Sequence, residues 1–364
     1  MSSIIKGVAA YKTRLPLRRP YHLSLITLDY FDSVMVRVET GNVTGFGEAT
    51  DVPGYFTQNL EDAWKFINLH GPELLGKKPE EALDRVVSQE KKLSFAATPL
   101  VTALESIIDP IETSVKESAI VPILGVVQGE TLEEIESDAR RLLREGYHTL
   151  KFKVGFSVTE DLERVCHLQT LLVPGVEIRL DANQAYSYSQ AVQFVEGLDP
   201  AGIELLEQPM GTDAWDEMTQ LVTISPVPLM LDEAITGEEE LDRTIETGCA
   251  GVVKFKLMKC GSFRYLETQI KKAFNAGLKV VLGNGVATDI GCFHEAQVAQ
   301  KTGLTVHAGE MNGFLKGIDQ FLDPSLRMEG ENLILPAGLP VVRWEILSQY
   351  VVEEISWGDM QPPR

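Results

Sequence analysis

The last two thirds of the chain alternate between short apolar runs and amphipathic stretches. The apolar runs have the length of strands, and the stretches between them, such as TLEEIESDARRLLREG, have the apolar period of helices. The eight strand candidates are PILGVV, TLKFKV, VEIRLDA, IELLEQP, VPLMLDE, GVVKFKL, KVVLGN and LTVHAGE. Eight strand–helix units in about 200 residues predict a closed, parallel (β/α)8-type barrel. An open doubly wound sheet is the alternative, but no G-x-G-x-x-G motif follows the first strand.

The first third of the chain has a different pattern. IIKGVAAYKTRL reads as a strand, and the alternating segments YFDSVMVRVET and TGFGEAT are joined by GNVTG, which indicates a hairpin. Segments from about Leu60 to Glu117 have helical spacing. We therefore predict an α+β domain at residues 1–120 and a barrel domain at residues 121–337. The tail, residues 338–364, is predicted to pack back on the first domain.

Composition narrows the choice of partners. Acidic residues outnumber basic ones by 53 to 33, which gives a formal net charge of −20. Such a surface repels phosphate backbones and anionic lipid, so it argues against nucleic acid and membranes as partners. The four cysteines form no Cys-x-x-Cys pair, and the N-terminus lacks an apolar leader with a cleavage site. Since no uncharged apolar stretch of about 18 residues occurs either, we expect a cytoplasmic protein.

Acidic residues stand at the ends of three consecutive strand candidates. Asp181 follows EIRL, Glu207 follows IELL and Asp232 follows PLML, at intervals of about 25 residues, the length of one strand–helix unit. Equivalent positions on successive strands of a barrel point into one mouth, where barrel enzymes have their active sites. The sequence therefore predicts that these three carboxylates converge.

Three converging carboxylates without histidine or cysteine form a hard oxygen site. Such a site suits Mg²⁺, with Mn²⁺ as the alternative. The competing interpretation is that each acid caps a helix or is simply solvated beyond its strand. For three acids at the same phase of consecutive units that interpretation is the weaker one, because the unpaired charges would repel one another.

Lysines flank the acids on neighbouring strand candidates. Lys151 and Lys153 are separated by one residue, as are Lys254 and Lys256, so each pair points to one side of its strand. Lys153 and Lys256 would face each other across the mouth, where they could act as bases on the two faces of a planar intermediate. Such a base needs a depressed pKa to act near neutrality. For Lys254 a structural role is expected, and for Lys259 a place on the surface.

In order along the chain, the segments LKFKVG, LDAN, LEQP, LDEA and VVKFKLMKCGS resemble the enolase superfamily, and within it the muconate-lactonizing subgroup. The resemblance covers the whole chain. It implies a (β/α)7β TIM-like barrel with an α+β N-terminal capping domain. It also implies an enzyme that removes the proton α to a carboxylate and stabilises the resulting enediolate with a metal ion.

The resemblance further implies roles for individual residues. Asp181, Glu207 and Asp232 would hold Mg²⁺, and Lys153 and Lys256 would form the acid–base pair. The candidates for substrate contact are Lys151, Asn183, Glu310, Tyr55, His22 and Asn284. Among these, Lys151 would bind the substrate carboxylate or tune Lys153. Tyr55 would be placed over the site by a tight Pro53-Gly54 turn.

Two segments bear on the subgroup. The seventh strand candidate, LKVVLGNGVATDIG, lacks the histidine that sugar-acid dehydratases and mandelate racemase-like members use, which argues against both. The eighth, HAGEMNGF, lacks the D-x-D of dipeptide epimerases and is closer to the G-T-E-L-F-G-P of muconate cycloisomerases. There Phe314 replaces the proline, and Glu310 could pair with a substrate ammonium or hold a leaving hydroxyl. His294 and His307 are expected to have core or hydrogen-bonding roles.

These features favour racemisation or epimerisation of a small amino-acid-like or N-substituted carboxylate, because two opposed lysines allow a proton to leave one face and return to the other. β-Elimination of the hydroxyproline dehydratase type and muconate-type cycloisomerisation share the first step and remain alternatives. From other classes, a non-catalytic metal- or anion-binding barrel and a phosphate-binding aldolase-like barrel remain. The expected partners are a small-molecule carboxylate and further copies of the chain in a homo-oligomer.

Overall fold

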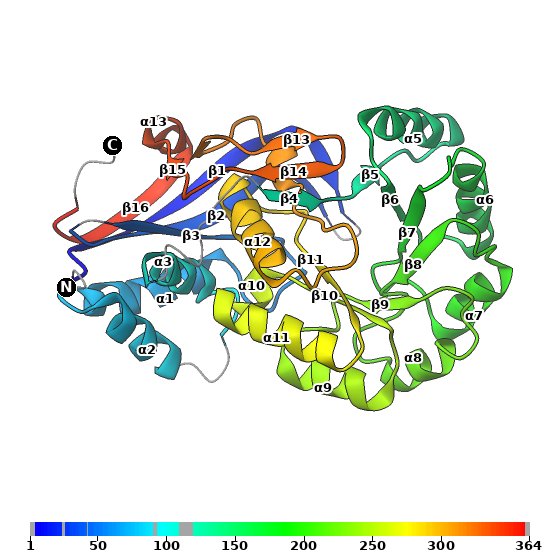
Figure 1. Cartoon of the computed structure of the whole chain (residues 1–364), viewed down its shortest axis with the longest axis horizontal. Helices are drawn as coiled ribbons and strands as arrows, with labels where there is room; N and C mark the ends of the chain where they lie inside the picture. The colour runs from blue at the N-terminus through cyan, green and yellow to red at the C-terminus, as the bar shows by residue number, and fades with distance from the viewer. Residues whose placement is uncertain (1–3, 24–25, 42, 90–92, 109–118, 361–364) are drawn as a thin grey trace.

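The computed structural model describes residues 4–23, 26–41, 43–89, 93–108 and 119–360. Figure 1 shows an antiparallel sheet with its helices on one side of the molecule and a barrel of strands ringed by helices on the other. The prediction of a capped, TIM-like barrel is confirmed. No helix within the described ranges is long and apolar enough to cross a membrane.

The capping domain is built on a four-stranded antiparallel sheet in the order β16-β1-β2-β3. Its strands are β1 (Gly7–His22), β2 (Thr27–Glu39), β3 (Thr44–Thr50) and β16 (Val351–Gly358). The tail of the chain thus belongs to the sheet of the first domain, since β16 pairs with β1 from Gly7↔Gly358 onward.

Three helices pack on the capping sheet and enclose a core separate from that of the barrel. They are α1 (Leu60–His70), α2 (Pro79–Gln89) and α3 (Thr98–Ile108), with the 3₁₀ helix η1 (Gly71–Leu74) after α1. Gly47 of β3 allows close contact, because a Cβ there would lie 2.0 Å from the carbonyl oxygen of Pro99. The predicted helical pattern extends to Glu117, but residues 109–118 lie outside the described residues.

Seven parallel strands form the barrel wall in sequential order. They are β5 (Gly125–Val127), β6 (Thr149–Lys153), β7 (Glu177–Asp181), β8 (Ile203–Glu207), β9 (Leu229–Leu231), β10 (Val252–Phe255) and β11 (Lys279–Leu282). The eighth segment, LTVHAGE, differs from expectation, because it forms two isolated parallel bridges, Val280↔Thr305 and Ile123↔Gly309, and no extended ladder. These bridges link it to β11 on one side and to the approach to β5 on the other, so they close the barrel.

Helices cover the outside of the barrel. They are α5 (Leu132–Glu145), α6 (Val158–Gln169), α7 (Tyr188–Gly197), α8 (Trp215–Leu221), α9 (Glu238–Thr247), α10 (Leu257–Cys260), α11 (Phe263–Asn275) and α12 (Asp289–Thr302). Their ends follow local rules: α5 begins at a capping box between Thr131 and Glu134 and ends at Gly146 in the left-handed conformation.

Short elements complete the chain around the barrel. β4 (Ala119–Pro122), β13 (Arg327–Glu329) and β14 (Asn332–Leu335) form one small sheet, and β12 (Leu322–Asp323) pairs with β15 (Val341–Val342). The remaining elements are η2 (Gly313–Leu315), α13 (Trp344–Leu347) and η3 (Ser348–Tyr350).

Strand alternation sorts the barrel residues into two sets. Outward residues such as Phe152 and Leu180 join the main apolar core beneath the helices. Inward residues of four strands form a small apolar cluster of their own, made of Leu205, Met230, Val252 and Val281. Two positions further along three of these strands, the inward residues are the charged Glu207, Asp232 and Lys254. A small apolar cluster therefore lies inside the barrel beneath the charged residues of its mouth.

Two buried glutamates of the capping domain bind the N-termini of barrel helices. Glu48 of β3 accepts hydrogen bonds from Thr288 N at 2.8 Å and Gly291 N at 2.7 Å, at the start of α12. Glu105 of α3 accepts from Phe263 N at 2.6 Å, at the start of α11. A carboxylate is stabilised there by unpaired N–H groups and by the helix dipole. These contacts hold the cap over the barrel.

Candidate active site

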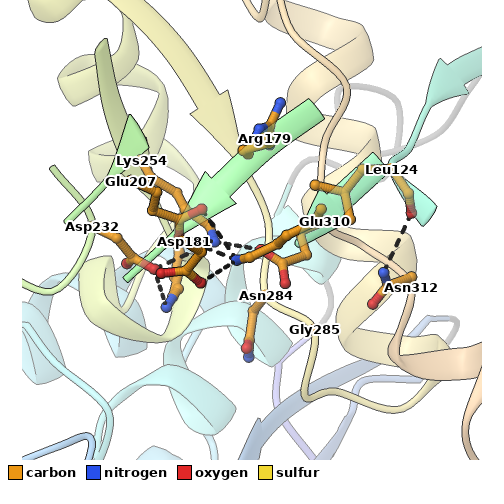
Figure 2. Close-up of polar contacts among 12 residues, drawn as sticks. Leu124, Arg179, Asp181, Glu207, Asp232, Lys254, Asn284, Gly285, Glu310 and Asn312 are labelled. Atoms are coloured by element: carbon orange, nitrogen blue, oxygen red, sulfur yellow. Dashed lines mark hydrogen bonds and ion pairs between the residues drawn. The ribbon is translucent and has the colours of Figure 1, made fainter. Parts of the chain in front are cut away.

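The three predicted metal-binding acids converge at the mouth of the barrel, as Figure 2 shows. Asp181 ends β7, Glu207 ends β8, and Asp232 follows β9 directly. Asp181 and Glu207 are aligned in the register of their strands. All three side chains are almost completely buried, with residues no more than 2% exposed. Burial of so much negative charge requires a compensating positive charge.

Two buried lysines supply that charge from inside the barrel. Lys151 Nζ lies 2.8 Å from Asp181 Oδ2 and 3.1 Å from Glu207 Oε2. Lys254 Nζ lies 2.9 Å from Glu207 Oε1 and 3.3 Å from Asp232 Oδ2. Both lysines also contact Glu310, on the eighth segment. Lys254 therefore has the structural pairing expected of it.

The ammonium groups stand between the acids. Within the ranges that the structure describes, no group of three or more His, Cys, Asp or Glu residues has the spacing to hold a metal ion directly. The electrostatics nevertheless differ among the acids. Burial opposes ionisation of Asp181, but Lys151 and Lys153 outweigh it and lower its pKa to about 2. Burial and the charge of Asp181 raise the pKa of Glu207 to about 7.

Glu207 is thus the acid whose charge is least well compensated. Its Oε2 atom is buried and accepts no hydrogen bond of good geometry, although Lys151 Nζ is close. An additional cation beside Glu207 would offset this deficit, and a set of carboxylate oxygens is the donor set that Mg²⁺ prefers. The residues present therefore fit a divalent cation, provided that the two ammonium groups shift aside.

The two predicted bases lie on opposite sides of the acids. Lys153, at the end of β6, has its Nζ 2.6 Å from Asp181 Oδ2. Lys256, directly after β10, has its Nζ 2.9 Å from Asp232 Oδ2. Strands β7, β8 and β9 separate them. Burial lowers the pKa of Lys256, but Asp232 outweighs it, so the pKa is raised. The pairing with Asp232 therefore raises the pKa of Lys256 instead of depressing it. A cation bound to Asp232 would weaken this upward shift.

Unusual backbone conformations occur where these strands end. Asn183, Gln184 and Gln208 have positive φ angles of 41°, 69° and 36°, which carry a cost for non-glycine residues. Asn183 Oδ1 contacts Lys153 Nζ, and Asn183 Nδ2 donates to Glu233 Oε1 at 2.7 Å. Gln208 Oε1 accepts from the backbone N–H of Asp232 at 2.9 Å. The strained residues thus orient the base and one of the acids.

A small pocket of about 50 Å³ opens above the charged cluster. Four of the candidates for substrate contact, Lys151, Asn183, Tyr55 and Glu310, line it together with both predicted bases. Tyr55 is brought there by the expected turn, in which Tyr55 N donates to Val52 O at 3.0 Å and Gly54 has a φ of 89°. Asn284 also lines the pocket, but its side chain is bound to the backbone of Val286.

His22 does not reach this pocket. It is exposed and its Nδ1 lies 3.0 Å from Thr27 Oγ1, beside a separate shallow pocket. The reason is strand alternation at the end of β1: Tyr21 faces the catalytic pocket, so the next side chain faces away from it. Tyr21, and not His22, is the residue of this strand that bounds the site.

Three further expectations have clear outcomes. The placement of Lys259 on the surface is wrong: its side chain is mostly buried in α10, and its Nζ lies 3.1 Å from Asp232 Oδ1. His294 is buried in α12 beside Phe263, and His307 Nδ1 lies 2.6 Å from Glu204 Oε1. Both histidines therefore have the structural roles expected of them.

Sequence reasoning missed two residues that border the site. Glu233 is 9% exposed and binds Asn183; its signal was the second acid of the LDEA segment. Lys316 lies in a loop after the eighth segment, and its Nζ donates to Asn312 Oδ1 at 2.7 Å and to the carbonyl oxygen of Gly285. No periodic pattern marked this lysine, because its position depends on how that loop folds.

Fold and site together define a class of protein, a capped (β/α) barrel whose mouth carries acids on three strands and a lysine on either side of them. Residues 134–339, more than half of the chain, match the family model described as "Enolase C-terminal domain-like". The chain belongs to this family and, with it, to the enolase superfamily group of mandelate racemase and muconate lactonizing enzymes.

The chain is similar to several characterised relatives along most of its length. It is 26% identical to the N-succinyl-L-Arg/Lys racemase of Bacillus cereus over 318 residues, 83% of each chain. It is 27% identical to the L-Ala-D/L-Glu epimerase of Bacillus subtilis, over 78% of this chain and 82% of the relative. With muconate cycloisomerase 1 of Acinetobacter baylyi it shares 26% identity, over 91% and 94%.

Solved structures share the fold. The crystal structure of the Bacillus cereus racemase superposes with a TM-score of 0.89 at 23% identity, covering 97% of this chain and all of that one. A dipeptide epimerase from Cytophaga hutchinsonii, complexed with Mg and the dipeptide D-Ala-L-Val, superposes with a TM-score of 0.87 at 20% identity, covering 97% and 99%.

Proposed function

We propose that this protein is a divalent-metal-dependent racemase or epimerase that acts on the α-carbon of a small amino-acid-like or N-substituted carboxylate. The observation that carries the proposal is the placement of Lys153 and Lys256 on opposite sides of three buried acids. A substrate held between them would present one face of its α-carbon to each lysine. The similarity to racemases and epimerases over most of the chain supports this reading.

In this proposal Asp181, Glu207 and Asp232 hold the cation, with Mg²⁺ favoured over Mn²⁺ by the all-carboxylate set. When bound, the cation supplies positive charge for the oxygens of the substrate carboxylate, which acidifies the α-proton. Lys153 then takes the proton from one face, and Lys256 returns a proton to the other. The reverse assignment serves the opposite enantiomer, since both lysines are chemically equivalent.

Neighbouring residues orient Lys153 and surround the place where the substrate would bind. The amide of Asn183 fixes the ammonium of Lys153 through its Oδ1 atom. Lys151, paired with Asp181 and Glu207, adds positive charge next to the substrate carboxylate. Glu310 can accept a hydrogen bond from a substrate ammonium or amide, and Tyr55 lines the pocket on the side of the cap.

A second candidate is cycloisomerisation of the muconate type. The alignment with muconate cycloisomerase 1 covers 91% of this chain, more than those with the racemase and epimerase relatives named above. In that reaction one lysine would protonate the α-carbon or remove its proton, and the opposite lysine would not be needed on the second face. The two functions thus differ in whether both lysines exchange the α-proton.

The test is α-proton exchange in D₂O with Mg²⁺, followed by NMR for both enantiomers of N-acyl amino acids and dipeptides, and for muconolactone. Lys153→Ala should slow α-proton exchange from one enantiomer by orders of magnitude, while exchange from the other enantiomer continues. Lys256→Ala should have the opposite effect. Lys271→Ala, which removes an exposed lysine of α11, serves as the matched control.

Two results would contradict the proposal. Wild-type-like exchange in either alanine variant would mean that the lysine is not a base. Loss of exchange from both enantiomers in proportion to a loss of bound Mg²⁺ would mean that the lysines only support the acids. Metal content measured for each variant separates these cases. Exchange with muconolactone alone would favour the cycloisomerase.

A further inference from the structure

Two buried carboxylates outside the catalytic pocket bind the chain next to the two predicted bases. Asp161 lies in the first turn of α6 and is 0% exposed, and Glu295 lies in α12 and is 3% exposed. Neither residue lines the pocket above the acids. Because a buried carboxylate is costly unless it accepts hydrogen bonds, the donors that each one binds indicate its role.

Asp161 binds the backbone just after Lys153. Its Oδ2 atom accepts hydrogen bonds from Gly155 N and Phe156 N, both at 3.0 Å. Gly155 has a φ angle of 104°, and a Cβ atom there would lie 2.6 Å from the Cβ of Ala185. The chain therefore turns tightly two residues beyond the base, against the loop that follows β7.

Tyr186 connects the same carboxylate to the polar partner of Lys153. Its Oη donates to Asp161 Oδ2 at 2.8 Å and accepts from Gly155 N at 3.2 Å. Burial and the charge of Asp161 raise the pKa of Tyr186, so the hydroxyl stays protonated and remains a donor. Tyr186 lies three residues after Asn183, whose Oδ1 contacts Lys153 Nζ. Asp161 and Tyr186, here called the Lys153 anchor, thus hold both the base and the amide that orients it.

Glu295 binds the backbone just after Lys256. Its Oε1 accepts from Leu257 N at 2.8 Å, and its Oε2 accepts from Asn284 N at 3.0 Å. Leu257 follows the base directly, and Asn284 follows β11 by two residues. Burial raises the pKa of Glu295 to about 7, although both N–H groups oppose the shift. One side chain, here called the Lys256 anchor, thus joins the ends of β10 and β11.

The two anchors are separate from each other. Figure 1 shows α6 and α12, the helices that carry the two carboxylates, at different places around the barrel. The Lys153 anchor binds the segments after β6 and β7, and the Lys256 anchor binds those after β10 and β11. No donor is shared between them. A change in one anchor should therefore displace one lysine and leave the other in place.

Building on the proposed function, we propose that each base has its own positioning residues: Asp161 with Tyr186 for Lys153, and Glu295 for Lys256. These residues act through the backbone and do not touch the substrate. A base must lie within hydrogen-bond reach of the proton that it takes, and a displacement of about 1 Å can slow a reaction on the order of a hundredfold. Since each lysine serves one enantiomer, loss of one anchor slows α-proton exchange from one enantiomer only.

The experiment uses one conservative variant for each anchor. Tyr186→Phe removes only the hydroxyl, because the ring can keep its packing on Phe194, 5.2 Å away between centroids. Glu295→Gln keeps the shape but leaves one carbonyl oxygen for two N–H groups. Exchange in D₂O with Mg²⁺ is measured for both enantiomers of the N-acyl amino acid that wild type exchanges fastest. Lys153→Ala and Lys256→Ala identify the enantiomer that each lysine serves.

Tyr186→Phe should slow exchange from the enantiomer served by Lys153 by about tenfold or more and leave the other within about twofold. Glu295→Gln should show the opposite pattern, and so should Glu295→Asp, whose shorter side chain cannot reach both N–H groups. In each case kcat should fall more than KM changes, because the anchors do not contact the substrate. Tyr188→Phe and Glu196→Gln, at exposed positions of α7, are the matched controls and should leave both enantiomers unaffected.

Amide hydrogen exchange, followed by mass spectrometry, reports the anchors independently of activity. Tyr186→Phe should speed amide exchange in residues 154–157 and 183–187, and Glu295→Gln should speed it in residues 256–260 and 283–286. Equal slowing of both enantiomers by an anchor variant, or no slowing of either, would overturn the inference. A merely structural role predicts equal slowing, in proportion to the loss of folded protein.

Failure of the proposed function remains distinguishable from failure of this inference. If no substrate exchanges its α-proton, or if the two lysine variants show no preference between enantiomers, the proposed function fails. Faster amide exchange confined to the segments of the altered anchor then still supports two separate anchors. Faster exchange at both sites, or at neither, overturns them.

Discussion

At the scale of single residues, the site is a balance of buried charges. Five lysines and five carboxylates meet at the barrel mouth: Lys151, Lys153, Lys254, Lys256, Lys259, Asp181, Glu207, Asp232, Glu233 and Glu310. Such a cluster contributes little net stability compared with an apolar core of equal volume. Its position at the carboxyl ends of the barrel strands indicates function, because perturbed pKa values concentrate at active sites.

Asp232 is the acid whose removal should be most informative. It faces three lysines, Lys254, Lys256 and Lys259, so Asp232→Asn leaves these ammonium groups short of negative charge. We expect Mg²⁺ affinity, measured by calorimetry, to fall at least about tenfold and exchange activity to fall by orders of magnitude. Asp216→Asn, on the surface of α8, is the control. Unchanged Mg²⁺ affinity in Asp232→Asn would exclude this residue as a ligand.

His294 should make the protein sensitive to mild acid. Burial beside Phe263 and Phe293 lowers its pKa from 6.5 to about 4. Because the folded state prefers the neutral ring, this stabilisation is complete above about pH 6.5 and is lost as the pH falls toward 4. The loss should amount to about 3 kcal/mol.

The measurement is the free energy of unfolding in urea between pH 7.5 and 4 for wild type and His294→Phe. The variant should lose less stability over this range than wild type. His148→Gln, which alters an exposed histidine, should follow wild type. Parallel curves for all three proteins would show that His294 does not carry the acid sensitivity.

At the scale of elements, two glutamates of the capping domain bind the N-termini of barrel helices and so connect the two domains. Glu105 of α3 accepts from Phe263 N and from Ser262 Oγ, both at 2.6 Å, where α11 begins. Glu48 plays the same part for α12. β3 and α3, which carry these two glutamates, therefore hold the capping domain against the barrel, so that Tyr21 of β1 and Tyr55 lie beside the acids.

Glu105→Ala should weaken this docking. It leaves the first N–H group of α11 without its acceptor, and a cost of about 2 kcal/mol in unfolding free energy is expected. The variant should also raise KM more than it lowers kcat, because the cap closes the pocket but does not supply the bases. Glu246→Ala, on the exposed face of α9, is the matched control. A variant with wild-type stability and KM would mean that Glu105 does not hold the domains together.

At the scale of the whole molecule, the two ends of the chain share one sheet. β16 pairs with β1 over its full length, and Figure 1 shows it lying along the outer edge of the capping sheet. Without it, β1 would present a row of unpaired N–H and C=O groups, which promotes association between molecules. The tail thus protects an edge as well as completing the domain.

A chain that ends after Tyr350 should therefore unfold at lower temperature and associate in solution. The measurements are thermal unfolding and light scattering at several protein concentrations. A chain that ends after Met360 keeps all of β16 and serves as control. If the shorter chain stayed monodisperse and as stable as the control, β16 would be dispensable for the sheet.

The sequence alone determined the features that depend on local period. The alternation of apolar runs with amphipathic stretches predicted the barrel, and the spacing of Asp181, Glu207 and Asp232 predicted one mouth. The single-residue separation of Lys254 and Lys256, like that of Lys151 and Lys153, predicted inward side chains. Each follows from a strand period of two and from the repeat of a β/α unit.

Only the tertiary structure decided the contacts that depend on closure of the barrel and docking of the cap. Lys151 meets Glu310 across 159 positions of sequence, and no local pattern reports that distance. The burial of Lys259 against Asp232, the outward orientation of His22 and the contact of Lys316 with Gly285 follow from how loops and short elements pack on one another. Loop packing depends on long-range contacts and not on hydrophobic period, so these features became visible only in the folded chain.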